Sequence, residues 1–229
     1  TSVGKHSMYS NTSGASNVAV GDDALSGNTT ASFNTAVGRL AMAANTTGHS
    51  NEAIGYESLR ANTTGYYNTA LGTQALQAVT TGNRNIGIGR LAGHKITTGL
   101  YNVNIGEWSN GSCITGTHNV AIGTNTMAAN TASYNTAVGG TALDTNSTGT
   151  ENAAFGTWSL TANTTASYNT ALGSNTLPAN TTGANNTALG RAALFANTTA
   201  SNNTAVGSSA LLANTTGTSN SALGHAALY

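Results

Sequence analysis

The sequence predicts an all-β fold, a parallel β-solenoid of the β-roll kind, from three observations. One unit begins thirteen times along the chain, and eleven of the twelve spacings are 17 residues while one is 16. Glycine stands at a fixed place in every unit, which would interrupt any helix. Large apolar residues also recur at fixed places, so copies stacked in register would bury them as columns. At a rise of ~4.8 Å per coil, about thirteen coils would form a rod roughly 60 Å long. The units start at Asn17, Asn34, Asn51, Asn68, Asn85, Asn102, Asn119, Asn135, Asn152, Asn169, Asn186, Asn203 and Asn220.

Each unit predicts two extended segments and a turn, and we number it from its first Asn as position 0. Positions 0 to +4, such as 34–38, predict a short strand that ends at a glycine bend. Positions +7 to +10, such as 75–78, predict a second strand or extended corner with Leu at +8 inward. The Asn-Thr-Thr-Gly segment, such as 45–48, predicts a turn.

Side chains alternate between the two faces of a strand, so positions +2 and +3 point in opposite directions. Position +3 is always large and apolar, and we expect it to face inward. Position +2 is nearly always Ala, and we expect another chain to pack closely against it. The predicted core therefore contains, at +3, Val20, Val37, Ile54, Leu71, Ile88, Ile105, Ile122, Val138, Phe155, Leu172, Leu189, Val206 and Leu223, and at +8, Leu25, Met42, Leu59 and Leu76.

Polar residues recur as strictly as the apolar ones. Asn at 0 and +11, and Thr at +12 and +13, are expected to form stacked ladders, in which amide side chains bond donor to acceptor along the stack. Two large apolar residues per coil make a thin core, so a lone chain would be marginal. We therefore expect a homo-oligomer, a parallel homotrimer packed along the Ala-rich +2 face.

Composition excludes several classes of function. The chain of 229 residues has zero formal net charge and only 6% charged residues, where ~25% is typical of soluble domains. It therefore has no electrostatic footprint for nucleic acid, and no apolar run long enough for membrane insertion. Histidines and acids are scattered over different repeat positions, and Cys113 is the single cysteine. We expect no metal, no cofactor and no enzymatic activity. Residues 1–229 are interpreted as a single repeat domain, a piece of a longer protein.

Several units resemble known repeats. The segments 34–38 (Asn-Thr-Ala-Val-Gly), 68–72 and 119–123 are similar to repeats of YadA-like trimeric adhesin heads, and 203–217 resembles repeat regions of phage tail fibres and bacterial surface proteins. The resemblance covers essentially the whole chain. It implies a parallel β-roll assembled as a homotrimer, which acts as a structural and adhesive rod. Such a rod would belong to a virion tail fibre or a bacterial cell surface, outside the cell. It would display or form a surface that binds a host glycan or protein.

The repeat is least regular at 79–118, and two interpretations remain open. Apolar residues replace Asn at position +11 (Val79, Ile96 and Cys113), while position +8 becomes Gly93 and then Asn110. The first interpretation is local repacking, in which the apolar +11 residues compensate for the missing Leu. The second is a functional patch.

The patch hypothesis names aromatic and basic residues. Trp108 and Trp158 share position +6, which is otherwise mostly polar and therefore expected to be exposed; an exposed Trp suits a ligand or a partner chain. The candidate ligand-binding residues are Trp108, Trp158, His94, Lys95 and Tyr101. Position +16 carries aromatic residues in alternate units, which we expect to cap each corner: Phe33, Tyr67, Tyr101, Tyr134 and Tyr168.

Two other classes of function are weighed against the adhesive rod. An ice-binding β-solenoid is suggested by regular Thr pairs on an uncharged face, although adjacent residues such as Thr46 and Thr47 would not share one strand face. A glycan-degrading enzyme on a β-helix needs paired carboxylates in a groove, and the scattered acids argue against it.

Overall fold

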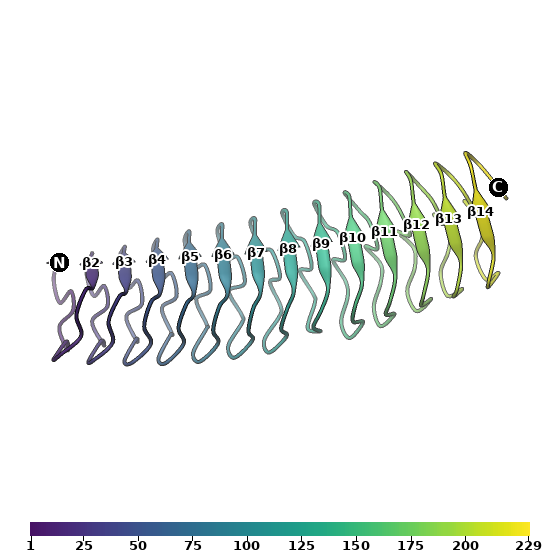
Figure 1. Ribbon diagram of the computed structural model, residues 1–229. Coiled ribbons are helices and arrows are strands. Elements are labelled where there is room, and N and C mark those ends of the chain that lie inside the picture. Colours follow the sequence, from purple (N-terminus) through teal and green to yellow (C-terminus); the bar gives the residue numbers. More distant parts are fainter. The chain divides into compact units, whose positions relative to one another are not determined.

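The computed structural model describes residues 1–229 and consists of two compact units, Thr1–Thr117 and His118–Tyr229. Within each unit, every repeat contributes one short strand and one long loop, and the strands stand side by side (Figure 1). The first unit contains β1 (Ser2–Val3), β2 (Val18–Val20), β3 (Thr35–Val37), β4 (Glu52–Ile54), β5 (Thr69–Leu71), β6 (Ile86–Ile88) and β7 (Val103–Ile105). The second contains β8 (Val120–Ile122), β9 (Thr136–Val138), β10 (Ala153–Phe155), β11 (Thr170–Leu172), β12 (Thr187–Leu189), β13 (Thr204–Val206) and β14 (Ser221–Leu223).

Both units are parallel β-solenoids, as the repeat predicts. In each unit every strand pairs in parallel with the next strand along the chain, and equal repeat positions lie opposite each other. Ala36 pairs with Ala53, and Val37 pairs with Ile54. Backbone hydrogen bonds join the coils outside the sheet as well. For example, the Leu59 N–H donates to the carbonyl oxygen of Ala75 at 2.9 Å.

The glycine at position +4 ends each strand, as predicted. Gly55 has φ 137°, and a Cβ there would lie 2.5 Å from the carbonyl oxygen of Gly72 in the next coil. Only a residue without a side chain allows both this backbone conformation and this close stacking.

The prediction that position +3 faces the core is wrong. None of the thirteen residues at this position is buried; Leu71 is 45% exposed and Leu172 is 46% exposed. The alanines at +2 point inward instead and are almost completely buried. The residues predicted to lie in the core that instead face outward are Val20, Val37, Ile54, Leu71, Ile88, Ile105, Ile122, Val138, Phe155, Leu172, Leu189, Val206 and Leu223. A chain that packs against this sheet would therefore meet +1 and +3, and cannot meet +2.

The narrow interior explains this orientation. At Gly87, which occupies position +2 of its coil, a Cβ would lie only 2.6 Å from Cγ of Leu76. Where Leu stands at +8, it thus fills the interior beside +2 and leaves room only for Ala or Gly; the larger Asn104 at +2 is buried beside Gly93, which has no side chain. A large side chain at +3 must consequently point to the outside. The prediction for +8 is confirmed: Leu25, Met42, Leu59 and Leu76 are all fully buried.

The second predicted strand is also wrong. Positions +5 to +10 form a turn rather than an extended segment. Positions +6 and +8 adopt left-handed backbone conformations in unit after unit, as at Glu57 (φ 54°) and Leu59 (φ 49°). These two residues fold the chain back sharply, so the coil is narrow and has a single sheet. Left-handed residues other than glycine are costly, and the stacked hydrogen bonds around them hold them in place.

Both predicted asparagine ladders are present: the ladder at position 0 is buried over most of each unit, whereas the ladder at +11 ends at Asn62 in the first unit and resumes at Asn130 in the second. At position 0, the amide of each Asn links three segments: Asn51 Oδ1 accepts from the Asn68 N–H at 2.9 Å, and its Nδ2 donates to the Gly65 carbonyl at 2.8 Å. At position +11, Asn62 Nδ2 donates to Asn45 Oδ1 at 2.7 Å and to the same Gly65 carbonyl at 3.0 Å. Each such carbonyl joins the two ladders. The core therefore contains buried amide columns beside its aliphatic side chains.

In the irregular coils, repacking occurs as the first interpretation predicts. Val79, Ile96 and Cys113 are fully buried at +11. A Cβ on Gly93 would lie 3.0 Å from Cδ1 of Ile96, so the Ile96 side chain extends into the space that Leu fills at +8 elsewhere. Asn62 Oδ1 is buried without a donor, because the next residue of its column is Val79.

Candidate functional site

The outward face of each sheet carries a continuous row of large apolar side chains. We call the residues at position +3 the apolar row. Their alignment follows from the register, in which Ile54 lies opposite Leu71 and Leu172 lies opposite Leu189. Ile54 is 44% exposed and Leu189 is 40% exposed. Exposed apolar side chains scattered singly are normal, whereas a contiguous patch points to an interaction surface.

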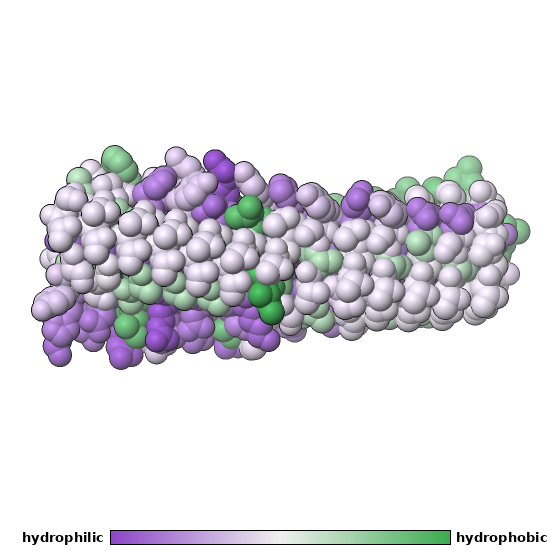
Figure 2. All heavy atoms as spheres, turned by 90° about the horizontal axis from the view of Figure 1, so that it is seen from below, coloured by the Kyte–Doolittle hydropathy of each residue, from purple (hydrophilic) through white to green (hydrophobic).

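The face that carries the threonines of position +12 differs from the sheet face. Figure 2 shows a face that is mostly pale, of near-neutral hydropathy, with strongly hydrophilic side chains gathered along its edges. Threonines at +12 cover the turn and are tied down: Thr46 Oγ1 donates to the Thr63 carbonyl at 2.9 Å, and Thr63 Oγ1 to the Thr80 carbonyl at 3.1 Å. Their hydroxyl protons are thus engaged in holding the coils together.

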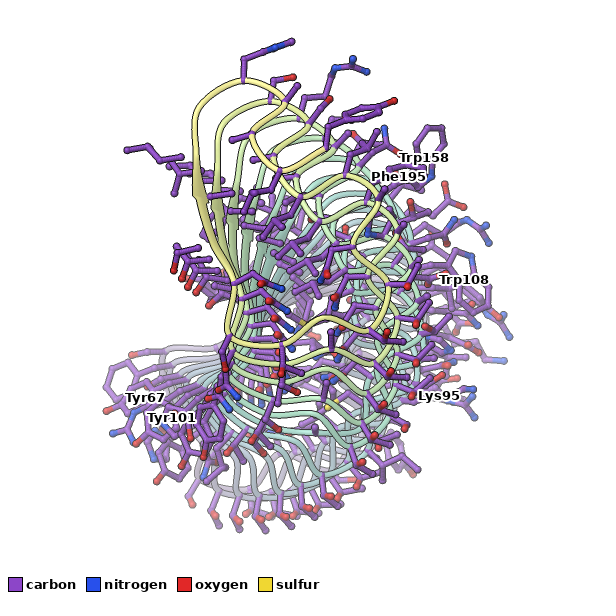
Figure 3. All side chains as sticks on the ribbon, turned by 90° about the vertical axis from the view of Figure 1, so that its right-hand side faces the viewer. Tyr67, Lys95, Tyr101, Trp108, Trp158 and Phe195 are labelled. Atoms are coloured by element: carbon purple, nitrogen blue, oxygen red, sulfur yellow. The ribbon has the colours of Figure 1, made fainter.

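The patch predicted around the irregular coils divides into separate places. Trp108 is 38% exposed, and its ring meets His94 edge to face, with centroids 5.0 Å apart. His94 Nδ1 lies 3.1 Å from the Leu91 carbonyl, and partial burial lowers the pKa of its imidazole. Trp108 and Lys95 project from one edge of the coil, whereas Tyr101 projects from the opposite edge (Figure 3). His94 and Trp108 are therefore in contact, but Tyr101 does not belong with them.

Trp158 lies in the second unit and is 53% exposed, so both tryptophans at +6 are exposed as predicted; the position as a whole is not, because Glu57 and Leu91 at +6 are buried. Phe195, 44% exposed, projects from the same side of that unit (Figure 3).

The best-defined cluster of the first unit consists of aromatic residues at positions +15 and +16 together with Arg84. We call the aromatic side chains at these two positions the aromatic row. His49 stacks on Tyr66 with ring centroids 5.2 Å apart, and Tyr66 meets Tyr67 edge to face at 5.3 Å. The Arg84 guanidinium carbon lies 5.6 Å from the centroids of both Tyr66 and Tyr67, and 5.3 Å from that of Tyr101. Arg84 Nη1 also donates to Tyr101 Oη at 2.7 Å.

Sequence reasoning interpreted the aromatic row only as caps and missed Arg84 and Tyr66. A usable pattern was present, because a charged residue stands at +16 between two tyrosines in both units: Arg84 between Tyr67 and Tyr101, and Glu151 between Tyr134 and Tyr168.

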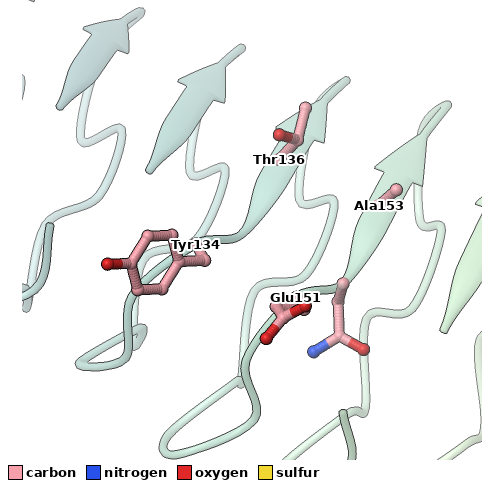
Figure 4. A pocket seen from close by; sticks show the side chains of 5 residues that line it. Tyr134, Thr136, Glu151 and Ala153 are labelled. Carbon is pink, nitrogen blue, oxygen red and sulfur yellow. The ribbon is translucent and has the colours of Figure 1, made fainter. Parts of the chain in front are cut away.

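A hollow of about 540 Å³ opens at the corresponding place in the second unit. It lies between the aromatic row and the sheet, and Tyr134 and Glu151 both point to this side (Figure 4). Tyr134 is 57% exposed and stacks on His118 at 5.1 Å. The lining residues are Tyr134, Thr136, Glu151, Asn152 and Ala153. The equivalent positions of the first unit are Tyr67, Thr69, Arg84, Asn85 and Ile86.

One buried carboxylate lies on the turn side of the first unit. Glu57 Oε2 accepts from Gln74 Nε2 at 3.0 Å and from Gln77 Nε2 at 2.6 Å, and Arg60 Nη1 lies 3.3 Å from Oε1. The Gln74 hydrogen bond is the main cause that lowers the pKa of Glu57. Because its oxygens are already bonded to Gln74, Gln77 and Arg60, this group holds two successive coils together rather than offering a reactive site.

No three His, Cys, Asp or Glu side chains gather as metal ligands would. No helix has the length and apolar character needed to cross a membrane. Comparison with known proteins found no matching family, no matching curated protein and no matching solved structure.

Proposed function

We propose that the chain is a structural and adhesive repeat segment of a phage tail fibre or a bacterial trimeric adhesin, assembled as a parallel homotrimer outside the cell. The observation that carries the proposal is the apolar row on the outward face of each sheet. Burying a large apolar side chain contributes about 1.5–3 kcal/mol. Row residues such as Leu71 and Leu172 are roughly half exposed, so each copy leaves a large part of this stabilisation unused.

Further copies of the same chain are the occupant that fits the apolar row. A parallel in-register stack repeats every coil, so an identical chain in the same orientation places apolar residue beside apolar residue along each unit. A foreign partner would need the same period. Covering the apolar row requires only one further copy. The number of three copies is taken from the resemblance to YadA-like heads. Three copies would also raise avidity for a surface receptor without any new contact.

Light scattering on the purified chain tests the assembly. We expect the mass of a trimer at all accessible concentrations. Leu71→Thr combined with Leu172→Thr should convert it to single chains that keep their β circular dichroism, because both side chains lie outside the core. The matched control is Thr64→Ala, an exposed change off the row. A chain that is monomeric as wild type would refute the assembly, and so would a trimer that withstands both Thr substitutions.

The ice-binding alternative gains one observation. In β11, β12 and β13 the exposed +1 positions are Thr170, Thr187 and Thr204, aligned in register with an aliphatic residue two places on. This is an uncharged ladder of Thr-x-aliphatic strands at a regular spacing. Measurement of thermal hysteresis decides the matter: a value near zero eliminates ice binding, and the adhesive proposal predicts that value.

A further inference from the structure

We propose that the first unit binds an acidic oligosaccharide, a chain of pyranose rings bearing carboxylates, at the cluster of Tyr66, Tyr67, Arg84 and Tyr101. The inference rests on the adhesive part of the proposed function and names the chemical class of the ligand. It starts from three properties of the cluster, namely the flat rings, the unmatched cation and the spacing of the tyrosines.

The cation is the first property. Arg39, Arg60 and Arg90 each face a carboxylate of the protein. Arg84 faces none; it is held by the three tyrosine rings and by the hydroxyl of Tyr101. This arrangement fixes the guanidinium at the surface with its charge unneutralised. An Arg fork is well suited to a carboxylate, which it can bind through two parallel hydrogen bonds.

The flat rings are the second property. Tyr67 is 51% exposed and Tyr101 is 42% exposed. They project side by side from one edge of the first unit (Figure 3). The C–H face of a pyranose packs on such rings.

The spacing is the third property. Tyr67 and Tyr101 occupy the same repeat position two coils apart, which corresponds to about 10 Å. A sugar ring advances an extended glycan by about one coil rise, so two rings can rest on the two tyrosines with the charge of Arg84 between them. The hollow at the equivalent place in the second unit lies open between the aromatic row and the sheet (Figure 4).

The second unit supplies an internal contrast. Glu151 takes the place of Arg84 between Tyr134 and Tyr168, so an acidic ligand would be repelled there although the rings repeat. In the first unit β6, which follows Arg84, and its neighbours β5 and β7 carry no acid. Glu52 lies in β4 and forms no ion pair with Arg84.

Calorimetric titration with tetragalacturonate tests the inference, with cellotetraose as the neutral sugar and tetraglutamate as the anion without rings. We expect tetragalacturonate alone to bind, with a Kd on the order of 0.1–1 mM that weakens as salt screens the charges. Arg84→Gln should weaken binding about tenfold or more, and Tyr67→Ala several-fold. Phe195→Ala, which removes an exposed aromatic ring in the second unit, should leave the Kd unchanged.

A gain of binding completes the design. Glu151→Arg should add a second, weaker site, because it places the same charge between Tyr134 and Tyr168, although Ser133 stands there in the place of Tyr66. The inference is overturned if cellotetraose or tetraglutamate binds as well as tetragalacturonate, if nothing binds, or if Arg84→Gln has no effect. Light scattering on the same samples separates the two proposals. A trimer that does not bind refutes only this inference, and a single chain that binds refutes only the trimer.

Discussion

Replacing one buried asparagine of the position 0 ladder should destabilise the chain more than its small side chain suggests. Asn51 Nδ2 donates to the Gly65 carbonyl at 2.8 Å, and Asn51 Oδ1 accepts from the Asn68 N–H at 2.9 Å. In Asn51→Ala the Asn68 N–H stays buried and loses its acceptor, which costs about 1–3 kcal/mol. The Gly65 carbonyl keeps its bond from Asn62, so its loss is about 1 kcal/mol. We therefore expect the free energy of unfolding to fall by about 2–4 kcal/mol.

Asn51→Asp separates the two halves of this cost. The new carboxylate can still accept from the Asn68 N–H, but its other oxygen would face the Gly65 carbonyl. Burial and this contact raise the folded pKa of the new group above the unfolded value of ~3.9. Folding then favours the protonated form, which can donate to Gly65. The variant should be most stable below pH ~3.9 and should lose stability as pH rises to the folded pKa.

Urea unfolding followed by circular dichroism measures both variants, with Thr64→Ala as the exposed control in the same coil. Hydrogen exchange at the Asn68 amide locates the effect, because that proton should lose protection in Asn51→Ala and keep it in Asn51→Asp at low pH. If Asn51→Ala unfolds within about 0.5 kcal/mol of Thr64→Ala, or if Asn68 remains fully protected, the ladder does not contribute as argued.

Three further predictions follow from burial, space and charge. Leu177→Ala should cost about 2–5 kcal/mol in urea unfolding because Leu177 is fully buried, while Leu172→Ala in the dissociated chain should cost less than about 1.5 kcal/mol; equal losses would contradict the assignment of inside and outside. Gly87→Ala should lower the free energy of unfolding by about 1–3 kcal/mol, because the added methyl would meet Leu76 at 2.6 Å; an unchanged urea midpoint would show that the interior can yield. Burial lowers the pKa of His94, so the folded chain favours the neutral ring; the stability that this ring contributes is complete above pH ~6.5 and declines as pH falls below it. His94→Gln should remove that part of the pH dependence, and a pH profile of urea midpoints checks it.

The fixed spacing of the repeat was enough to predict the stacked parallel coils and both amide ladders. Each ladder needs only equal residues at equal positions, as at Asn34 and Asn51, and stacking then follows from the period. The +8 column could be predicted for the same reason. The local sequence could not say which face of the strand is inside, because alternation is the same for either choice. That choice depends on the width of the coil. The left-handed residues at +6 and +8 determine this width, and residue types such as those of Glu57 and Leu59 do not indicate a left-handed conformation.

The small residue at nearly every +2 position carried the missing information; the exception is Asn104, which lies beside Gly93. A position that tolerates Ala and Gly, as at Ala36 and Gly87, faces the tightest space in the molecule, and here that space is the interior of the coil. Which of the candidate site residues lie close together was harder to predict from the sequence. Tyr101 and Trp108 are seven residues apart, yet the turn of the coil sends them to opposite edges, while Tyr67 and Arg84 meet because their positions coincide in successive coils.

The irregular coils show that positions +8 and +11 share one volume. Val79 ends the amide column and leaves Asn62 Oδ1 without a donor. Replacing Val79 alone by Asn would supply that donor, but the oxygen of the new amide would then face Ile96 and lack a donor itself. Ile96 in turn cannot become polar alone, because its side chain fills the space beside Gly93. The apolar +11 residues and the missing Leu at +8 are therefore one coupled replacement. Such coupling explains how a strict repeat can change its interior over several coils while the outer positions, including Arg84 and Tyr101, remain free to form a site.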